Sequence, residues 1–133
     1  MRITAHFFSE EFSCKDLEKT PYPCKWVDER LFPLCQALEK IRDMVGRGLV
    51  ITSGYRTKKY NATLKGSASN SQHLTGRGCD FRCERGNEFI GARELYRVVE
   101  NMIINGEIPD GGLGSYPWHV HYDQRGKQSR WKK

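Results

Sequence analysis

Apolar residues recur every three or four positions in two long stretches of the chain, which is the spacing of one face of an α-helix. In the first stretch these positions are Leu31, Cys35, Leu38, Ile41 and Val45. Asp28 can cap the start of this helix, and Gly46 and Gly48 can end it. Pro33 conflicts with so early a start, because proline lacks an amide hydrogen, so the first turn is expected to begin later. We expect this helix to cover a sheet.

The second stretch spans residues 86–106 and also predicts a helix. Its apolar face consists of Phe89, Ala92, Leu95, Val99 and Met102. Gly106 follows these positions and is expected to end the helix. Between the two stretches, residues 57–64 predict one or two helical turns. Residues 65–78 are small, polar and rich in glycine, which is typical of a loop.

Strands are predicted where β-branched or alternating residues occur in short runs. Residues 49–52, "LVIT", predict a buried strand that ends at Ser53–Gly54. Residues 79–84, "CDFRCE", alternate and predict a second strand, while residues 110–126 predict a hairpin that turns around Pro117. The pattern therefore predicts one α+β domain over residues 1–133, with a small antiparallel sheet packed against helices.

The two ends of the chain lack this regular patterning. Residues 1–26 are expected to form an irregular N-terminal segment with one short helical turn near Ser9. Residues 126–133 form a basic tail, which we expect to be mobile and able to hold a polyanion loosely. This tail has Trp131 as its one aromatic residue and no groove-reading pattern, so no specific nucleic-acid binding is expected.

The chain carries a formal net charge of +6. Such a charge favours anionic partners, for example nucleic acid, anionic lipid or an acidic polymer such as a bacterial cell wall, although plain solubility explains it equally well. No apolar run is long enough to span a membrane. The first residues, "MRITAHFFSEEFSC", lack the apolar core of a secretory signal peptide, so we expect synthesis in the cytoplasm.

Five cysteines occur in the chain, an odd number without any C-x-x-C pair. The simplest interpretation is reduced, mostly buried thiols in a protein made in a reducing cytosol. A disulfide between Cys14 and Cys24 and a second metal site are the alternatives.

Candidate metal ligands lie in the loop and strands of the second half. His119 and His121 alternate along a predicted strand, so they share one face, and Asp123 follows in the same row. Asp80 lies in the middle of another predicted strand, where an unpaired carboxylate would be costly to bury. With His73 from the preceding loop, two imidazoles and a carboxylate could bind a catalytic zinc ion. Hydrogen bonds that satisfy the same residues are the alternative.

The segment "SQHLTGRGCD" resembles the S-x-H-x-x-G-x-A-x-D signature of the zinc D-Ala-D-Ala carboxypeptidases, a family that includes peptidoglycan endopeptidases. The match holds at Ser71, His73, Gly76 and Asp80, while Gly78 replaces the usual alanine. "TSGYRTKKYNATLKGS" is similar to the SGYR segment of that family. "GGLGSYPWHVHYDQRG" is similar to the closing segment of its phage and bacterial subgroup. The resemblance covers nearly the whole chain and implies a hedgehog/DD-peptidase-like fold.

This resemblance implies roles for individual residues. His73, Asp80 and His121 match the three ligands of one zinc ion per chain. Arg56 matches the arginine that binds a substrate carboxylate, and Ser71 matches a residue near the substrate. An ion pair with Asp80 or Glu84 is the alternative for Arg56, and a turn-forming hydroxyl is the alternative for Ser71.

The loop between the first two ligands is expected to be tight. Gly76 and Gly78 would let the backbone turn there, and Thr75 and Arg77 would brace the turn.

The expected catalytic base departs from the family pattern. Several groups of the family carry Glu or Asp three residues before the last ligand, where this chain has Trp118. His119 takes the place of a second histidine found in H-x-H relatives, so it is the candidate catalytic residue. Asp110 and Asp123 are reserve carboxylates. Asp123 is expected instead to brace a ligand or to pair with Arg125.

The sequence therefore predicts a monomeric zinc metallopeptidase that acts on stem peptides of bacterial peptidoglycan. It would be a D-Ala-D-Ala carboxypeptidase or an endolysin-like endopeptidase, made in the cytoplasm and active at the cell wall or in the periplasm after release. A cytosolic dipeptidase would share these features. A zinc-stabilised module that binds the wall without catalysis is the alternative from another class, and nucleic-acid binding ranks last.

Overall fold

A five-stranded sheet forms the centre of the α+β fold, as expected from the alternating runs. The computed structural model describes residues 1–85 and 90–133. The strands are β1 (Leu49–Ser53), β2 (Gly78–Cys83), β3 (Gly112–Ser115), β4 (Val120–Asp123) and β5 (Ser129–Lys132). Their order is β1-β2-β4-β3-β5, and all neighbours are antiparallel except β3 and β5. The predicted hairpin around Pro117 is confirmed as β3 and β4.

The first long helix, α1 (Phe32–Val45), begins just before Pro33, which occupies its first turn as proline tolerates. The late start is thus confirmed. Asp28 is not the cap, because it lies inside a preceding π-helical turn, Val27–Leu31. Gly46 ends α1 with φ at 70°, a left-handed conformation that glycine adopts without steric cost.

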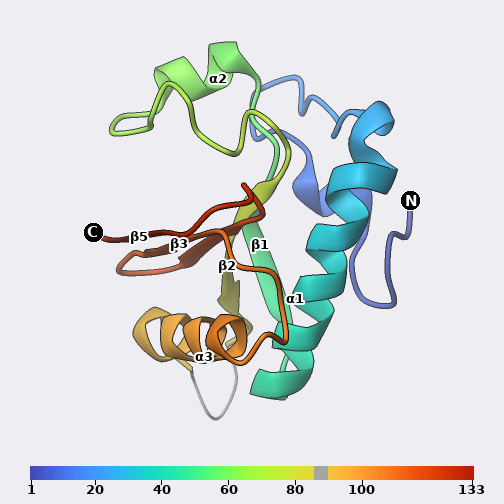
Figure 1. Cartoon of the computed structure of the whole chain (residues 1–133). Coiled ribbons are helices and arrows are strands. Elements are labelled where there is room, and N and C mark those ends of the chain that lie inside the picture. Colours follow the sequence, from blue (N-terminus) through green and yellow to red (C-terminus); the bar gives the residue numbers. More distant parts are fainter. Residues whose placement is uncertain (86–89) are drawn as a thin grey trace.

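The second long helix, α3 (Ala92–Ile104), is shorter than its apolar pattern predicted. Of the expected apolar face, Leu95, Val99 and Met102 are buried, whereas Phe89 lies outside the described residues. The short helix α2 (Lys58–Thr63) is capped by the hydroxyl of Thr57, which accepts from the amide of Tyr60. Figure 1 shows α2 and α3 at opposite ends of the molecule, with the sheet between them.

The two faces of the sheet differ in chemistry. In β2 and β4 the alternate residues Cys79, Phe81, Val120 and Tyr122 are fully buried in the core that α1 and α3 share. The intervening residues Asp80, His121 and Asp123 are the buried polar residues of the same strands. Strand alternation therefore separates a packed apolar face from a polar one.

The N-terminal segment is irregular but well packed. Phe7, Phe12 and Tyr22 are buried in the core, and the expected turn near Ser9 is a 3₁₀ helix, Ser9–Phe12. The carboxylate of Glu39 in α1 accepts hydrogen bonds from the hydroxyl of Thr4 and the amide of His6, both at 2.7 Å.

The expectation of a mobile basic tail is wrong for most of that segment. Residues Ser129–Lys132 form β5, which pairs in parallel with β3. The amide of Lys133 continues the ladder and donates to the carbonyl of Ser115 at 2.7 Å.

The cysteines and the helices agree with two further expectations. All five cysteines are free, and all but Cys24 are buried, so the alternative disulfide to Cys14 is not formed. Among the described residues, no helix has the length and apolar character needed to cross a membrane.

Candidate metal centre

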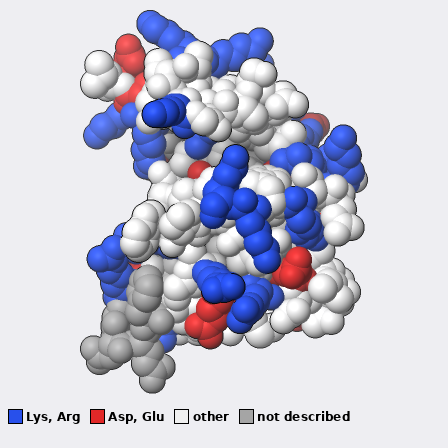
Figure 2. Space-filling view, turned by 90° about the vertical axis from the view of Figure 1, so that its left-hand side faces the viewer, with Lys and Arg blue, Asp and Glu red and all other residues white. Residues whose placement is uncertain are grey.

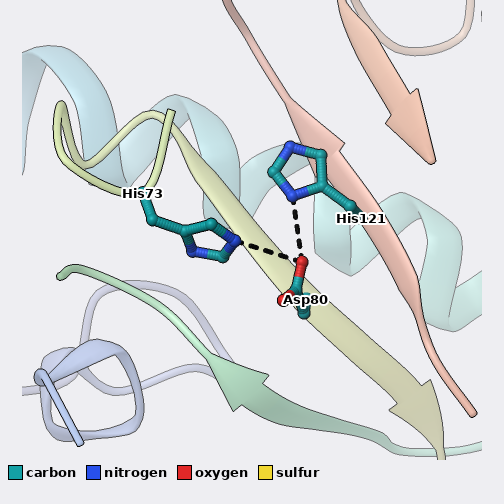
Figure 3. Close-up of side chains that lie close together, drawn as sticks. All are labelled: His73, Asp80 and His121. Carbon is teal, nitrogen blue, oxygen red and sulfur yellow. Dashed lines mark hydrogen bonds and ion pairs between the residues drawn. The ribbon is translucent and has the colours of Figure 1, made fainter. Parts of the chain in front are cut away.

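Three residues from three segments converge on the polar face of the sheet. His73 comes from the loop after α2, Asp80 from the middle of β2 and His121 from β4 (Figure 3). The antiparallel register of β2 and β4 pairs Asp80 with His121. His73 Nε2 lies 3.2 Å and His121 Nδ1 lies 2.9 Å from the same oxygen, Asp80 Oδ1. The three ligand atoms lie within 4.8 Å of one another.

The outer nitrogen of each imidazole is held by an acceptor. His73 Nδ1 lies 2.7 Å from the carbonyl oxygen of Gly54, and His121 Nε2 lies 2.6 Å from Asp123 Oδ2. A carbonyl and a carboxylate can only accept, so each of these nitrogens carries a hydrogen. In a neutral ring the other nitrogen then presents its lone pair to Asp80 Oδ1. Three acceptors that face one another need positive charge between them, which either a proton on an imidazole or a metal ion supplies, and two imidazoles with a carboxylate are a donor set that suits zinc.

The carboxylate of Asp123, which contacts His121, is itself held by Arg125. Asp123 is fully buried, and Arg125 donates to its two oxygens, from Nε at 2.9 Å and from Nη2 at 2.8 Å. Burial raises the pKa of Asp123, but the hydrogen bonds from Arg125 and His121 outweigh it and hold the pKa well below its usual range. Asp123 therefore both braces His121 and pairs with Arg125, as the sequence indicated, and its lowered pKa makes it a poor acceptor for a proton from water.

The charge on Asp80 is also favoured. Burial raises the pKa of this carboxyl, but contacts with His121 and His73 hold the pKa well below its usual range. The neighbouring carboxylates have the opposite effect on the pKa of His121. Burial lowers its pKa, but Asp123 and Asp80 outweigh burial and raise it. The cluster therefore favours positive charge between the imidazoles and the carboxylate.

The glycines of the intervening loop have two different tasks. Gly76 has φ at 71°, and a Cβ there would lie 2.6 Å from Tyr22 Oη, so it provides the tight turn. Gly78 is not a turn residue, because it lies in β2. A Cβ on Gly78 would lie 2.7 Å from Asp123 Cβ, so its missing side chain makes room for that residue. Thr75 braces the turn through its hydroxyl, which donates to the carbonyl of Gln72 at 2.9 Å.

His119 lies one residue before β4 and faces the cluster, as the alternation predicted. Its Nε2 lies 3.6 Å from Asp80 Oδ2. The Tyr116 ring stacks on the imidazole, with ring centroids 4.5 Å apart and an interplanar angle of 18°. Burial lowers the pKa of His119 and the charge of Asp80 raises it, with a net lowering that favours the neutral, proton-accepting ring.

Arg56 and Ser71 also lie at this centre. Arg56 Nη2 lies 3.6 Å from Asp80 Oδ2, so the alternative ion pair with Asp80 is observed. Hydrogen bonds from its guanidinium to Ser53 Oγ and Asn61 Oδ1, both 3.2 Å long, fix its direction. Ser71 Oγ accepts from the amide of His73 at 3.2 Å, which is the expected turn contact, and Ser71 also lines the adjoining cavity.

A cavity of about 700 Å³ opens onto the cluster and includes all three candidate ligands, Arg56, Ser71 and His119 in its wall. Its cationic lining residues are Arg56, Lys65, Arg125, Lys127 and Lys133. Asp80 is the acidic member of the lining. Figure 2 shows Lys and Arg side chains gathered around the hollow on this side of the molecule. The cavity therefore favours anionic ligands.

Around the cluster, the structure differs from two expectations drawn from the sequence. Asp110 is not at the centre, because it is absent from the cavity wall and pairs with Arg130 at 2.8 Å. Trp131 and Lys133 belong to the cavity wall, although their segment was expected to be a mobile tail. No local pattern indicated this, since the pairing of β5 with β3 is a long-range contact.

The chain also matches one family model. The model described as peptidase M15 matches residues 5–123, which include all three residues of the cluster. A search of curated proteins found no match.

Proposed function

The chain belongs to the zinc-dependent peptidase M15 family, and we propose that it is a zinc metallopeptidase that hydrolyses peptide bonds in the stem peptides of bacterial peptidoglycan. The observation that carries this proposal is the cluster of His73, Asp80 and His121 in the wall of a cationic cavity. The match supports peptidase activity, and the cavity supports the choice of an anionic peptide as substrate.

The cluster would hold one zinc ion per chain through His73 Nε2, a carboxylate oxygen of Asp80 and His121 Nδ1. With zinc held there, the site would gain a Lewis acid, and the pKa of a water molecule beside it would fall to about 7. Gly54 and Asp123 keep the two imidazoles oriented through hydrogen bonds to their outer nitrogens. The ligand rings therefore need little reorganisation when the metal binds.

His119 is the proposed proton-transfer residue. Its Nε2 lies 3.6 Å from Asp80 Oδ2, beside the proposed metal ligands. The neutral imidazole can take a proton from the attacking water and return it to the leaving amine. Trp118, at the position of the family carboxylate, is 81% exposed and offers no alternative base.

Arg56 is the proposed binding residue for a substrate carboxylate. Its guanidinium is directed by Ser53 and Asn61, and its side chain is only 14% exposed. A fixed guanidinium can grip a carboxylate through two parallel hydrogen bonds. Ser71, in the same wall, can add a hydroxyl contact to the substrate.

Stem peptides suit the cavity because they combine free carboxylates with D-residues. The cavity offers several cationic side chains against the single carboxylate of Asp80, which already faces the histidines. We infer that the chain acts as a monomer at the cell wall or in the periplasm, where this substrate lies. The cleaved bond would be a carboxy-terminal D-Ala bond or an internal bond cleaved in the manner of an endolysin.

A second candidate is a zinc-stabilised module that binds the wall without catalysis. The absence of a family carboxylate at Trp118 favours it. Both candidates share the metal cluster, so the distinction depends on turnover alone.

The test is a digest of purified peptidoglycan by the zinc-loaded protein, with the products identified by mass spectrometry. We expect new peptide or amino-acid products from the wild type and none from His121→Ala. Binding to the polymer without any product, across several wall types, would contradict peptidase function and support the binding module.

A further inference from the structure

Three residues from neighbouring strands form a row across the outer part of the sheet. In the register, Gly114 of β3 is the partner of His121 in β4 on one side and of Trp131 in β5 on the other. Gly114 has no side chain, and a Cβ there would lie only 2.4 Å from Trp131 Cε2. The indole therefore lies across the glycine, and its ring centroid is 5.1 Å from that of His121.

A second contact links the same indole to His119. Trp131 Nε1 donates to the hydroxyl oxygen of Tyr116 at 2.9 Å. The Tyr116 ring stacks on the imidazole of His119. The indole thus touches the candidate ligand directly and the candidate proton-transfer residue through one tyrosine.

The indole makes a third contact, with the guanidinium of Arg125. The guanidinium of Arg125 lies over the Trp131 ring, with Cζ 5.4 Å from the centroid. Arg125 also bonds Asp123, which braces His121. The contacts therefore close a ring through His121, Asp123, Arg125 and Trp131.

We propose that Trp131 is a positioning residue for the reaction, which holds Tyr116 against His119 and covers the outer side of His121. This inference rests on the proposed function. Trp131 lies beyond residues 5–123, so β5 adds to the centre a part that the family match does not include. His119 lies in the turn before β4 rather than in the ladder, so its ring depends on side-chain contacts for its position. A misplacement of about 1 Å at a reacting group can cost roughly 100-fold in rate.

The variant Trp131→Phe tests the proposal, because it removes the indole N–H and keeps an aromatic ring. We expect kcat to fall by roughly tenfold or more with KM changed by less than about twofold, since Arg56 and Ser71, the proposed substrate-binding residues, are unchanged and Phe keeps an aromatic ring in the cavity wall. Zinc content should be unchanged. The matched control is Lys132→Ala on the same strand, whose Nζ lies over the Tyr96 ring of α3 and not in the cavity wall. It should keep the wild-type kcat.

Tyr116→Phe removes the acceptor of the same hydrogen bond and stands in if Trp131→Phe does not fold. Because both changes break one contact, their effects should not add, and the double variant should be no slower than the slower single variant. Unchanged kcat in both single variants would overturn the proposal, as would effects that multiply in the double variant.

A readout without substrate separates this proposal from the proposed function. The Tyr116 ring should shift the NMR ring-proton signals of His119, which can be assigned by their loss in His119→Gln. Both aromatic variants should move these signals, whereas Lys132→Ala should not. Unmoved His119 signals in a folded Trp131→Phe protein would contradict positioning, whether or not the wild type cleaves peptidoglycan.

Discussion

The buried carboxylate of Asp123 accepts a hydrogen bond from His121 Nε2 at 2.6 Å, and this contact decides which nitrogen of His121 is free. Because Nε2 carries the hydrogen, Nδ1 is left to face Asp80. In His73 the two nitrogens are exchanged. The carbonyl of Gly54 holds Nδ1, and Nε2 faces Asp80. Residues outside the cluster therefore hold the imidazole nitrogens that face Asp80 and that could bind a metal.

The variant Asp123→Asn should weaken zinc binding by about 10- to 100-fold, the usual cost of losing a partner that orients a metal ligand. The amide keeps the shape of the carboxylate but loses its charge, so it holds the hydrogen on Nε2 less strongly. Zinc affinity can be measured by competition with a chromogenic chelator. Asp110→Asn is the matched control, since Asp110 pairs with Arg130 away from the cavity and should bind zinc as the wild type does. Equal affinities for the two variants would contradict the role of Asp123.

His119 and His121 should differ in kind when each is replaced by alanine. His121→Ala should lose both zinc and activity. His119→Ala should keep zinc and the fold, but its kcat should fall by roughly two to four powers of ten, the scale of a lost general acid or base. Zinc content and turnover on the same preparations check this. A fully active His119→Ala protein would show that the proton-transfer residue lies elsewhere.

Arg56→Lys should raise KM by about tenfold, because a lysine keeps the charge but cannot form the two parallel hydrogen bonds. A substrate with the recognised carboxylate converted to an amide provides the control. The wild type should process this amide as poorly as the variant processes the parent peptide, and the variant should barely distinguish the two substrates. If the variant loses the same factor on both substrates, Arg56 does not bind that carboxylate.

Much of the fold could be predicted from local patterns. Alternation in residues 79–84 gave the buried strand and directed Asp80 away from Cys79 and Phe81, because successive side chains in a strand point to opposite faces. The late start of α1, with Pro33 in its first turn, could also be predicted from the sequence. The pairing of Asp80 with His121 follows from strand register, which residues far apart in sequence decide together.

β5 and the role of Trp131 were not predictable in this way. The segment is basic and short, and it becomes a strand only because β3 offers it a partner edge. The role of Gly114 could not be predicted either, because its missing side chain makes room for the indole of Trp131, which comes from another strand. Gly78 was expected to form a turn, yet it serves the packing of Asp123. These features depend on tertiary contacts between distant residues.

The N-terminal segment supplies a prediction about pH. Burial raises the pKa of Glu39, but hydrogen bonds from Thr4 and His6 outweigh it and lower the pKa. A lowered carboxyl pKa adds stability above the unfolded value of about 4.3, and that stability is lost as pH falls through the folded pKa. Glu39→Gln should therefore lower the free energy of unfolding by about 1 kcal/mol at pH 7 and by less below about pH 4.

Chemical denaturation at both pH values measures this difference. The exposed carboxylate of Glu18 gives the control, and Glu18→Gln should match the wild type at each pH. A stability gap for Glu39→Gln that is the same at both pH values would contradict the titration of that carboxylate.

The central claim is that His73, Asp80 and His121 together bind one zinc ion, and metal analysis of purified, zinc-dialysed protein tests it most directly. The donor set predicts about one zinc per chain in the wild type. It predicts loss of the metal in both His73→Ala and Asp80→Ala, with circular dichroism used to show that each variant is folded. Full zinc occupancy in either folded variant, or no zinc in the wild type, would contradict the account.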